Sequence, residues 1–186
     1  INTTANTGSS PTNMVAYNGK LYLSANDGAN GAELWVSDGS NAGTSLFKNI
    51  NTVAAIGSSP SNFFVINGKL FFVANDGLKG NELWITDGSV GGTNMVKDIN
   101  ISGTSGSDPA NFTLFQNKLF FTANDGINGV ELYVSDGTLL GTNIIKNIHA
   151  IASSSPSSLT VFQNKLFFTA DNGFVGQELW VSDGTS

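Results

Sequence analysis

Short apolar runs, broken every few positions by Asn, Asp and Gly, follow one another along the whole chain. In the block that begins at Pro60, the first two runs are separated only by Asn67-Gly68. These two residues readily adopt the positive φ angles that a type I′ hairpin turn requires. Asn-Asp-Gly and Asp-Gly close the second and third runs, so we expect four short antiparallel strands in this block. The predicted strands cover residues 62–66, 69–74, 82–86 and 93–99.

The pattern Glu-Leu-aromatic-x-x-Asp-Gly-Ser/Thr occurs in the third run of every block and defines a repeat. Trp84 follows Trp35 by 84 − 35 = 49 residues, Tyr133 follows by 133 − 84 = 49, and Trp180 by 180 − 133 = 47. This period in a β-patterned chain is typical of a propeller blade. We predict an all-β fold, a four-bladed β-propeller of four-stranded antiparallel blades whose last blade lacks its fourth strand. We expect a single propeller domain at 1–186, with repeats at about 1–50, 51–99, 100–148 and 149–186.

The third run also carries a family resemblance. Glu82 to Ser89 (ELWITDGS), followed by Gly92-Thr93, resembles the ELWxxDGT repeat family of large bacterial surface and secreted proteins. The match covers essentially the whole chain, and the order of strands is similar to the WD40-like repeats of periplasmic β-propellers. The family is known mainly as a repeat in proteins without an assigned activity, so the resemblance implies a fold and a location. Tyr133 in place of Trp, and Asp171-Asn172 in place of Asn-Asp, depart from the pattern.

The charge of the chain bears on its partners. The net charge is −6, and all eight basic residues are Lys. A nucleic-acid partner is not expected, because phosphate recognition relies on clustered positive charge and on guanidinium groups. No apolar run is long enough to cross a bilayer, and Ile1-Asn2-Thr3-Thr4 lacks the character of a signal peptide, so we expect no membrane insertion and a mature or excised piece. Absent Arg, few Lys and many Asn, Thr and Ser favour a secreted or cell-surface protein, bacterial in origin.

The loop after the second strand of each repeat is the predicted ligand-binding region. In a blade of this order the loop lies on the same face as the connection between blades, and each loop offers carboxylate and amide oxygens. Such oxygens suit Ca²⁺, although one carboxylate per loop is little charge and the spacing is not that of an EF-hand. Turn formation alone accounts for the same residues. The candidate residues are Asn26, Asp27, Asn75, Asp76, Asn124, Asp125, Asp171 and Asn172.

Two other repeated positions have structural and functional interpretations. The glutamate of each third strand, such as Glu82, is expected to pair with a repeated Lys or with backbone N–H groups, because an unpaired buried carboxylate is costly. The alternative for it is a metal ligand or a catalytic acid. The aromatic residue two positions later is expected to pack between blades, and its alternative is a stacking platform for sugar rings.

These observations lead to three hypotheses of function. The first is a non-enzymatic extracellular repeat module that binds carbohydrate or protein ligands, a glycan or a surface protein, through loops on one propeller face, where repetition gives avidity. The second is a structural subunit of an extracellular filament, sheath or surface layer that self-assembles through the open edge of the last blade. The third is an enzyme built on the propeller, which needs acids that break the repeat, and Asp98, Asp108 and Asp171 are such acids. The first is preferred here, so no enzyme activity is expected.

Overall fold

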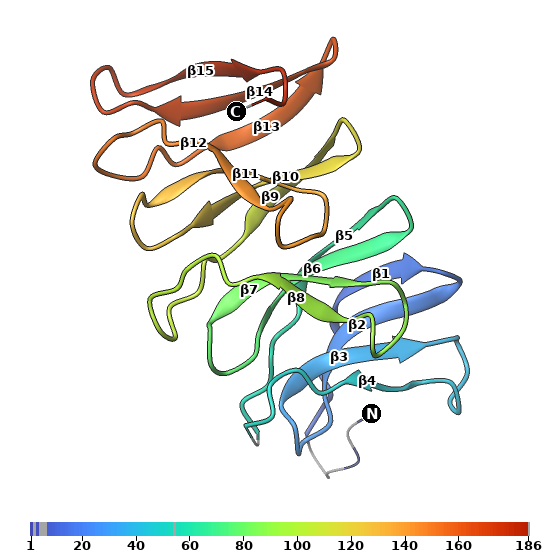
Figure 1. Ribbon diagram of the computed structural model, residues 1–186. Helices are drawn as coiled ribbons and strands as arrows, with labels where there is room; N and C mark the ends of the chain where they lie inside the picture. Colours follow the sequence, from blue (N-terminus) through green and yellow to red (C-terminus); the bar gives the residue numbers. More distant parts are fainter. Residues whose placement is uncertain (2, 4–6, 54, 186) are drawn as a thin grey trace.

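Fifteen β-strands make up the fold in the computed structural model, which describes residues 1, 3, 7–53 and 55–185 (Figure 1). Within these residues there is no helix that could cross a membrane. The strands are β1 (Thr12–Tyr17), β2 (Lys20–Asn26), β3 (Ala32–Ser37), β4 (Ser45–Lys48), β5 (Ser61–Ile66), β6 (Lys69–Asn75), β7 (Asn81–Thr86), β8 (Asn94–Lys97), β9 (Ala110–Phe115), β10 (Lys118–Asn124), β11 (Val130–Ser135), β12 (Asn143–Lys146), β13 (Ser157–Phe162), β14 (Lys165–Asp171) and β15 (Gln177–Ser182).

The strands form four antiparallel sheets, which we call blades 1 to 4. Blades 1, 2 and 3 have the orders β1-β2-β3-β4, β5-β6-β7-β8 and β9-β10-β11-β12, and blade 4 has the order β13-β14-β15. Each blade is a meander in which consecutive strands pair, as short connections favour. The predicted four-bladed β-propeller with a three-stranded last blade is therefore confirmed.

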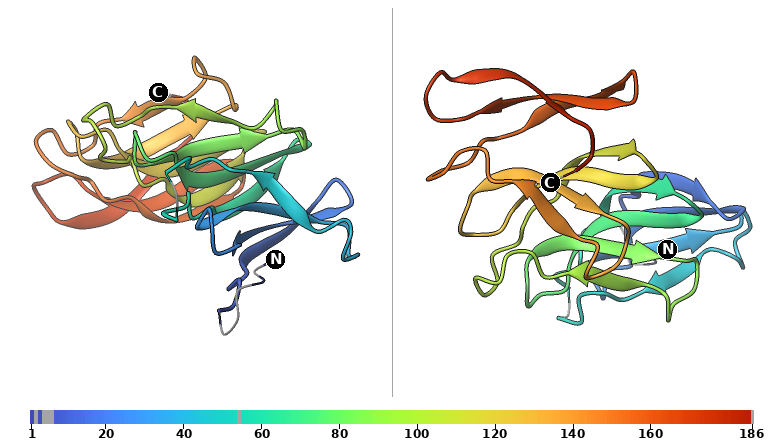
Figure 2. Two further views of the ribbon diagram at one scale, coloured as in Figure 1. Left: turned by 90° about the horizontal axis from the view of Figure 1, so that it is seen from below. Right: turned by 45° about the horizontal axis from the view of Figure 1, so that its top comes forward.

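The blades are stacked in chain order, and blades 1 and 4 lie at opposite ends of the stack in Figure 1 and in the left view of Figure 2. Each inner blade covers one face of the blade before it and one face of the blade after it. Leu83 of β7, which faces blade 3, is fully buried, whereas Leu179 at the same position of β15 is 71% exposed. The molecule thus repeats one blade-to-blade interface three times and ends with an uncovered face on blade 4.

The hairpin between the first two strands of a blade is a tight two-residue turn, as its residues predict. Asn67 and Gly68 have φ angles of 50° and 70°. Gln116 and Asn117, which replace Asn-Gly in blade 3, have φ angles of 48° and 59°. The turn is therefore kept without glycine, because Asn tolerates the left-handed region.

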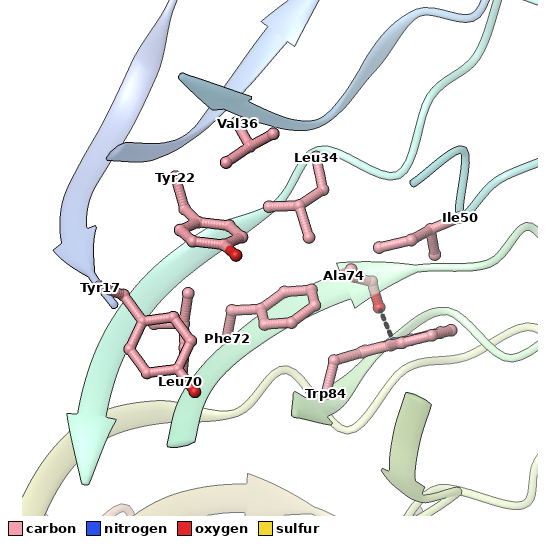
Figure 3. Close-up of a cluster of buried hydrophobic side chains, with 9 residues drawn as sticks. All are labelled: Tyr17, Tyr22, Leu34, Val36, Ile50, Leu70, Phe72, Ala74 and Trp84. Carbon is pink, nitrogen blue, oxygen red and sulfur yellow. Dashed lines mark hydrogen bonds between the residues drawn. The ribbon is translucent and has the colours of Figure 1, made fainter. Parts of the chain in front are cut away.

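The repeated aromatic residue packs between blades. Trp84 of β7 and Phe72 of β6 lie in one buried cluster with Tyr22 and Leu34 of blade 1, and the Trp84 and Phe72 ring centroids are 6.3 Å apart (Figure 3). The Trp84 Nε1–H donates to the carbonyl oxygen of Ala74 at 3.0 Å, the contact drawn in Figure 3. This arrangement satisfies the Trp84 indole N–H inside an apolar interface, so the expected packing between blades is confirmed for Trp84. Trp35 packs instead with Leu23, Ala25 and Leu46 of its own blade.

The repeated glutamate binds backbone N–H groups of the chain that leads to the next blade. The Glu82 carboxylate, with no exposed surface, accepts hydrogen bonds from the N–H groups of Ile99, Asn100 and Ser107 at 3.1, 3.3 and 3.0 Å. The Ser107 hydroxyl adds a fourth bond of 2.5 Å. We call this set of contacts the glutamate lock. Corresponding locks are formed by Glu33 with the segment 50–58 and by Glu131 with the segment 148–154.

The lock corrects two expectations. The fourth strand was predicted to extend to Ile99, but β8 ends at Lys97, since the Ile99 N–H bonds to Glu82 and not to a neighbouring strand. The pairing of the glutamate with a repeated lysine is wrong, whereas its pairing with backbone N–H groups is confirmed. Lys97 instead donates to the carbonyl oxygen of Thr142 in the next blade at 2.7 Å.

Candidate functional site

The loop residues predicted to bind a ligand lie where they were expected, beside the connection between blades. In blade 1 the Asn26 N–H donates to the Ser9 carbonyl of the incoming segment at 2.9 Å. The Asp27 carboxylate closes the loop itself, because one of its oxygens accepts the N–H groups of Ala29 and Asn30, both at 2.8 Å. The Asn30 N–H holds the pKa of Asp27 below its usual value.

The same turn recurs in the other three blades. Asp76 accepts two backbone N–H groups at 2.8 Å, and Asp125 accepts two at 2.9 and 2.7 Å. In blade 4 the residue types are exchanged, and Asn172 takes the place of the aspartate as acceptor. Turn formation therefore accounts for these side chains in every blade. Their role in ligand binding stays a prediction.

The expected Ca²⁺ site also stays a prediction. Within the described ranges, no three or more His, Cys, Asp or Glu side chains gather in a way that could hold a metal ion. Each loop offers a single carboxylate whose oxygens already accept turn N–H groups, as for Asp27. A cation bound to such a loop would depend on backbone carbonyls and water for its other ligands.

One cleft between blades 2 and 3 is lined in part by residues that differ from their counterparts in the other repeats. Two of its lining residues carry carboxyl groups. It has a volume of about 280 Å³ and lies between the end of β8 and the sheet of blade 3. Apolar side chains make much of its wall, and Asp98, Asp125 and Tyr133 are its acidic and phenolic groups. The lining residues are Lys97, Asp98, Ile99, Ile101, Asp125, Ile127, Tyr133, Asn143 and Ile144.

The pair of residues that includes Asp98 differs in blade 2 from the corresponding pairs in blades 1 and 3. In blades 1 and 3 the corresponding residues are asparagines, and Asn147 donates to Asn128 at 2.8 Å. In blade 2 the pair is Asp98 and Lys79, which form an ion pair through Oδ2. The other carboxyl oxygen of Asp98, Oδ1, is buried and has no hydrogen-bond partner among the described residues. Asp98 thus keeps one acceptor atom unused.

Asp125 and Tyr133 form the opposite wall of the cleft. The Tyr133 hydroxyl donates to Asp125 Oδ2 at 3.2 Å, and the Asn128 side chain donates to the same oxygen at 2.6 Å. Burial acts to raise the pKa of Asp125, but its N–H and O–H donors prevail and lower it. Burial and the nearby Asp125 charge raise the pKa of Tyr133, which therefore remains a hydrogen-bond donor. Near neutral pH this wall presents a carboxylate and a phenol.

The sequence had predicted only part of this cleft. Asp125 was among the candidate binding residues, Asp98 was named only among the acids that an enzyme would need, and Tyr133 was noted as a departure from the repeat. Asp98 and Tyr133 both differ from their counterparts in the other repeats, and both lie between blades 2 and 3. This common difference is the feature of the sequence that could have linked them. Their proximity depends on the packing of two blades.

Comparisons with known proteins concern the fold. No protein-family model matches the chain, and no curated protein matches it. An endo-arabinase from Bacteroides thetaiotaomicron VPI-5482 is a similar solved structure, with 16% identity over 95% of this chain and 76% of that one and a TM-score of 0.38. An α-L-arabinofuranosidase from Clostridium thermocellum ATCC 27405 gives 13% identity over 95% and 68% of the two chains and a TM-score of 0.41. A prolyl endopeptidase structure gives 11% identity over 88% and 25%, with a TM-score of 0.46.

These matches correct the functional expectation. Both the preferred hypothesis, a non-enzymatic extracellular module, and its alternative, a structural subunit of a filament or layer, assumed that the chain has no activity. Several of the similar structures are glycoside hydrolases, including a family 117 enzyme from Zobellia galactanivorans. The non-enzymatic assignment is therefore withdrawn. At these identities the similarity itself describes the fold alone.

Proposed function

We propose that the protein is carbohydrate-active and that it binds a sugar and hydrolyses its glycosidic bond in the cleft between blades 2 and 3. The observation that carries this proposal is the presence of Asp98 and Asp125 in one cleft, at the interface where both the Asn pair and the Trp of the repeat are replaced. Most glycoside hydrolases use a pair of carboxyl groups that flank the glycosidic bond.

The two carboxyl groups have environments that suit different roles. In hydrolysis, one carboxyl group gives a proton to the oxygen that leaves the anomeric carbon. Water supplies the hydroxyl group that binds this carbon, and its other proton goes to the second carboxylate. Asp125 is assigned the second role, because its lowered pKa keeps it ionised near neutral pH. Asp98 is the remaining carboxyl group in the cleft and is left with the first role; in this role its unpaired Oδ1 carries the proton that is given to the leaving oxygen, while Oδ2 stays beside the Lys79 ammonium group.

The rest of the cleft supports binding of a sugar. The Tyr133 hydroxyl group and the Asn143 amide border the cleft. The isoleucine side chains give an apolar surface for the C–H face of a pyranose or furanose ring. Tyr133 is smaller than the tryptophan at the same position of the other blades, so it fills less of the interface between blades 2 and 3.

The test is hydrolysis of a panel of nitrophenyl glycosides, which includes arabinosides, xylosides and galactosides, by the full chain. We expect turnover of at least one substrate, and we expect Asp98→Asn and Asp125→Asn each to lower kcat by about 10²-fold or more. Asp27→Asn is the matched control, because Asp27 forms the same turn in blade 1. Its turnover should be unchanged.

Two results would contradict the proposal. One is the absence of turnover across the panel together with the absence of sugar binding by calorimetry. The other is turnover that Asp98→Asn leaves intact. Thermal unfolding of each variant should accompany the assay, so that loss of activity is separated from loss of the fold.

We further propose that the protein works outside the cell, on the surface of a bacterium or secreted from it. The support is compositional, namely the absence of arginine among eight basic residues and the abundance of Asn, Ser and Thr. The resemblance to the ELWxxDGT repeat family agrees with this location. Immunodetection in the culture medium and on intact cells tests it, and a signal confined to the lysate contradicts it.

A further inference from the structure

A second pocket between blades 2 and 3 lies at the end of the strands that is opposite to the proposed hydrolytic cleft. Asn117, just before β10, borders this pocket, whereas Asp125, just after β10, borders the cleft. The pocket has a volume of about 310 Å³, and the buried side chains of Ile66, Phe71 and Leu119 form its apolar wall. This volume is at the lower end of the range for small-molecule sites and suits a ligand of about one ring.

In both other interfaces, two aromatic rings of the earlier blade occupy the corresponding place. Between blades 1 and 2 these are Tyr17 and Tyr22, whose ring centroids are 5.6 Å apart (Figure 3). Between blades 3 and 4 they are Phe115 and Phe120, 5.4 Å apart. The first ring of each pair reaches the next blade, because a Cβ atom on the turn glycine of that blade would lie 3.6 Å from Tyr17 Cε1 and 3.2 Å from Phe115 Cε1.

Blade 2 has Ile66 in the place of the first ring, whereas Phe71 keeps the second. The corresponding turn glycine of blade 3 is Gly137, and the atoms nearest to its Cβ position are Ile85 Cδ1 and Phe71 Cζ, at 2.6 and 3.1 Å. Ile85 does not border the pocket, so its side chain does not take the place of the missing ring. The pocket therefore lies where the other two interfaces hold the first aromatic ring.

The hydroxyl group of Tyr17 shows which polar contacts this place offers. It donates to the Gly68 carbonyl oxygen of the next blade at 2.6 Å and to the Thr86 carbonyl oxygen at 3.4 Å. The residues of blade 3 at these two positions are Asn117 and Ser135, and both border the pocket. A side-chain amide of blade 2 donates to the Asn117 carbonyl oxygen at 2.9 Å, and a carbonyl oxygen can accept a second hydrogen bond.

We propose that this pocket binds a small uncharged phenol, whose ring takes the place of the missing aromatic side chain. The ring packs on the apolar wall, and the hydroxyl group donates to the Asn117 carbonyl oxygen, close to Ser135. Lys69 and Asp136 place one charge of each sign at the pocket, so it favours a neutral ligand over an ion of either sign. The site is separate from the hydrolytic cleft and does not depend on the proposed function.

The test is a titration of the isotope-labelled full chain with para-cresol, which is the side chain of tyrosine, followed by two-dimensional NMR. We expect saturable shifts of the amide resonances of Phe71, Asn117 and Ser135, with the stoichiometry of a single site. Toluene, which has the same ring without the hydroxyl group, should bind at least about tenfold more weakly, because it leaves the carbonyl oxygens without the donor.

Three substitutions locate the site. Ile66→Tyr supplies the missing ring and hydroxyl group, so it should abolish the shifts. Val65→Tyr is the matched control, because Val65 is 41% exposed and does not border the pocket, and it should leave the shifts unchanged. Tyr17→Ile should open a second site between blades 1 and 2, with new shifts at Gly68 and Thr86.

The same spectra show whether each variant is folded. Shifts that survive Ile66→Tyr, shifts confined to the exposed apolar residues of blade 4, or equal affinities for para-cresol and toluene would overturn the proposal. If Ile66→Tyr does not fold, Tyr17→Ile decides, since a new site supports the proposal and its absence contradicts it. Failure of phenol binding would leave hydrolysis at the Asp98 cleft intact, so the two proposals fail independently.

Discussion

At the scale of single residues, the buried glutamate has the clearest consequences. Four donors from a neighbouring segment converge on the carboxylate of Glu82, which has no exposed surface. Removal of one partner from such a buried cluster costs more than a surface ion pair contributes, because the remaining polar groups lose water and partner together. Glu178, at the same repeat position of blade 4, is exposed and accepts no hydrogen bond from any described residue.

We therefore expect Glu82→Ala to lower the free energy of unfolding by about 3–5 kcal/mol. Glu178→Ala, the same substitution at the same repeat position, should change it by less than about 0.5 kcal/mol. Urea unfolding followed by tryptophan fluorescence measures both. Equal effects of the two substitutions would show that the lock does not stabilise the interface.

The lock should also depend on pH. Burial raises the pKa of Glu33 and Glu82, against the hydrogen bonds that act to lower it. A carboxyl group whose pKa is raised on folding contributes stability that is fully present below its unfolded pKa of about 4.3 and is lost as the pH rises through the raised value. The stability advantage of the native chain over Glu82→Gln should thus be largest near about pH 4 and narrow toward about pH 7. Urea unfolding across this range measures it, and an advantage that widens with pH would show that the four donors outweigh burial.

At the scale of elements, the connections between blades depend on close backbone approach. A Cβ atom on Gly106 would lie 2.2 Å from the backbone nitrogen of Asn81, an atom that cannot move aside. A Cβ atom on Gly91, in the turn between β7 and β8, would meet nothing within 4 Å. Gly106 therefore allows the connection between blades 2 and 3 to contact β7 closely, whereas Gly91 has space for a side chain.

Gly106→Ala should consequently destabilise the chain by about 1–3 kcal/mol through overpacking. Gly91→Ala should stay within about 0.5 kcal/mol of the native chain. Differential scanning calorimetry of both variants is the measurement. A stable Gly106→Ala variant would mean that the connection can move away from β7.

The sequence predicts strands well and contacts between blades less well, for a physical reason. Asn67-Gly68 determines the turn between β5 and β6 locally, because only a few residues adopt both φ angles. The end of β8 depends on Glu82, a residue of another strand, so the predicted extension to Ile99 was wrong. Asp98 and Asp125 belong to different repeats. An analysis that treats the repeats as equivalent does not show that these two residues lie in one cleft.

At the scale of the whole molecule, stability should vary along the stack of blades. Blades 2 and 3 are covered on both faces, whereas Leu179 and Val181 of blade 4 are 71% and 53% exposed. In a stack where each unit contacts only its neighbours, a terminal unit has one interface fewer to hold it.

We expect hydrogen–deuterium exchange to be at least about tenfold faster for the amides of β13 and β15 than for those of β6 and β10. Mass spectrometry of peptic fragments resolves these strands. Uniform protection across the four blades would instead indicate one cooperative unit.

The glutamate lock also implies an order of events during synthesis on the ribosome. The partners of Glu33 and Glu82 lie up to 25 residues further along the chain, at Ser58 and Ser107. Each lock can therefore close only after the start of the next blade has left the exit tunnel. Chains fold from the N-terminus as they emerge, so the blades should be secured one at a time, each by the arrival of its successor.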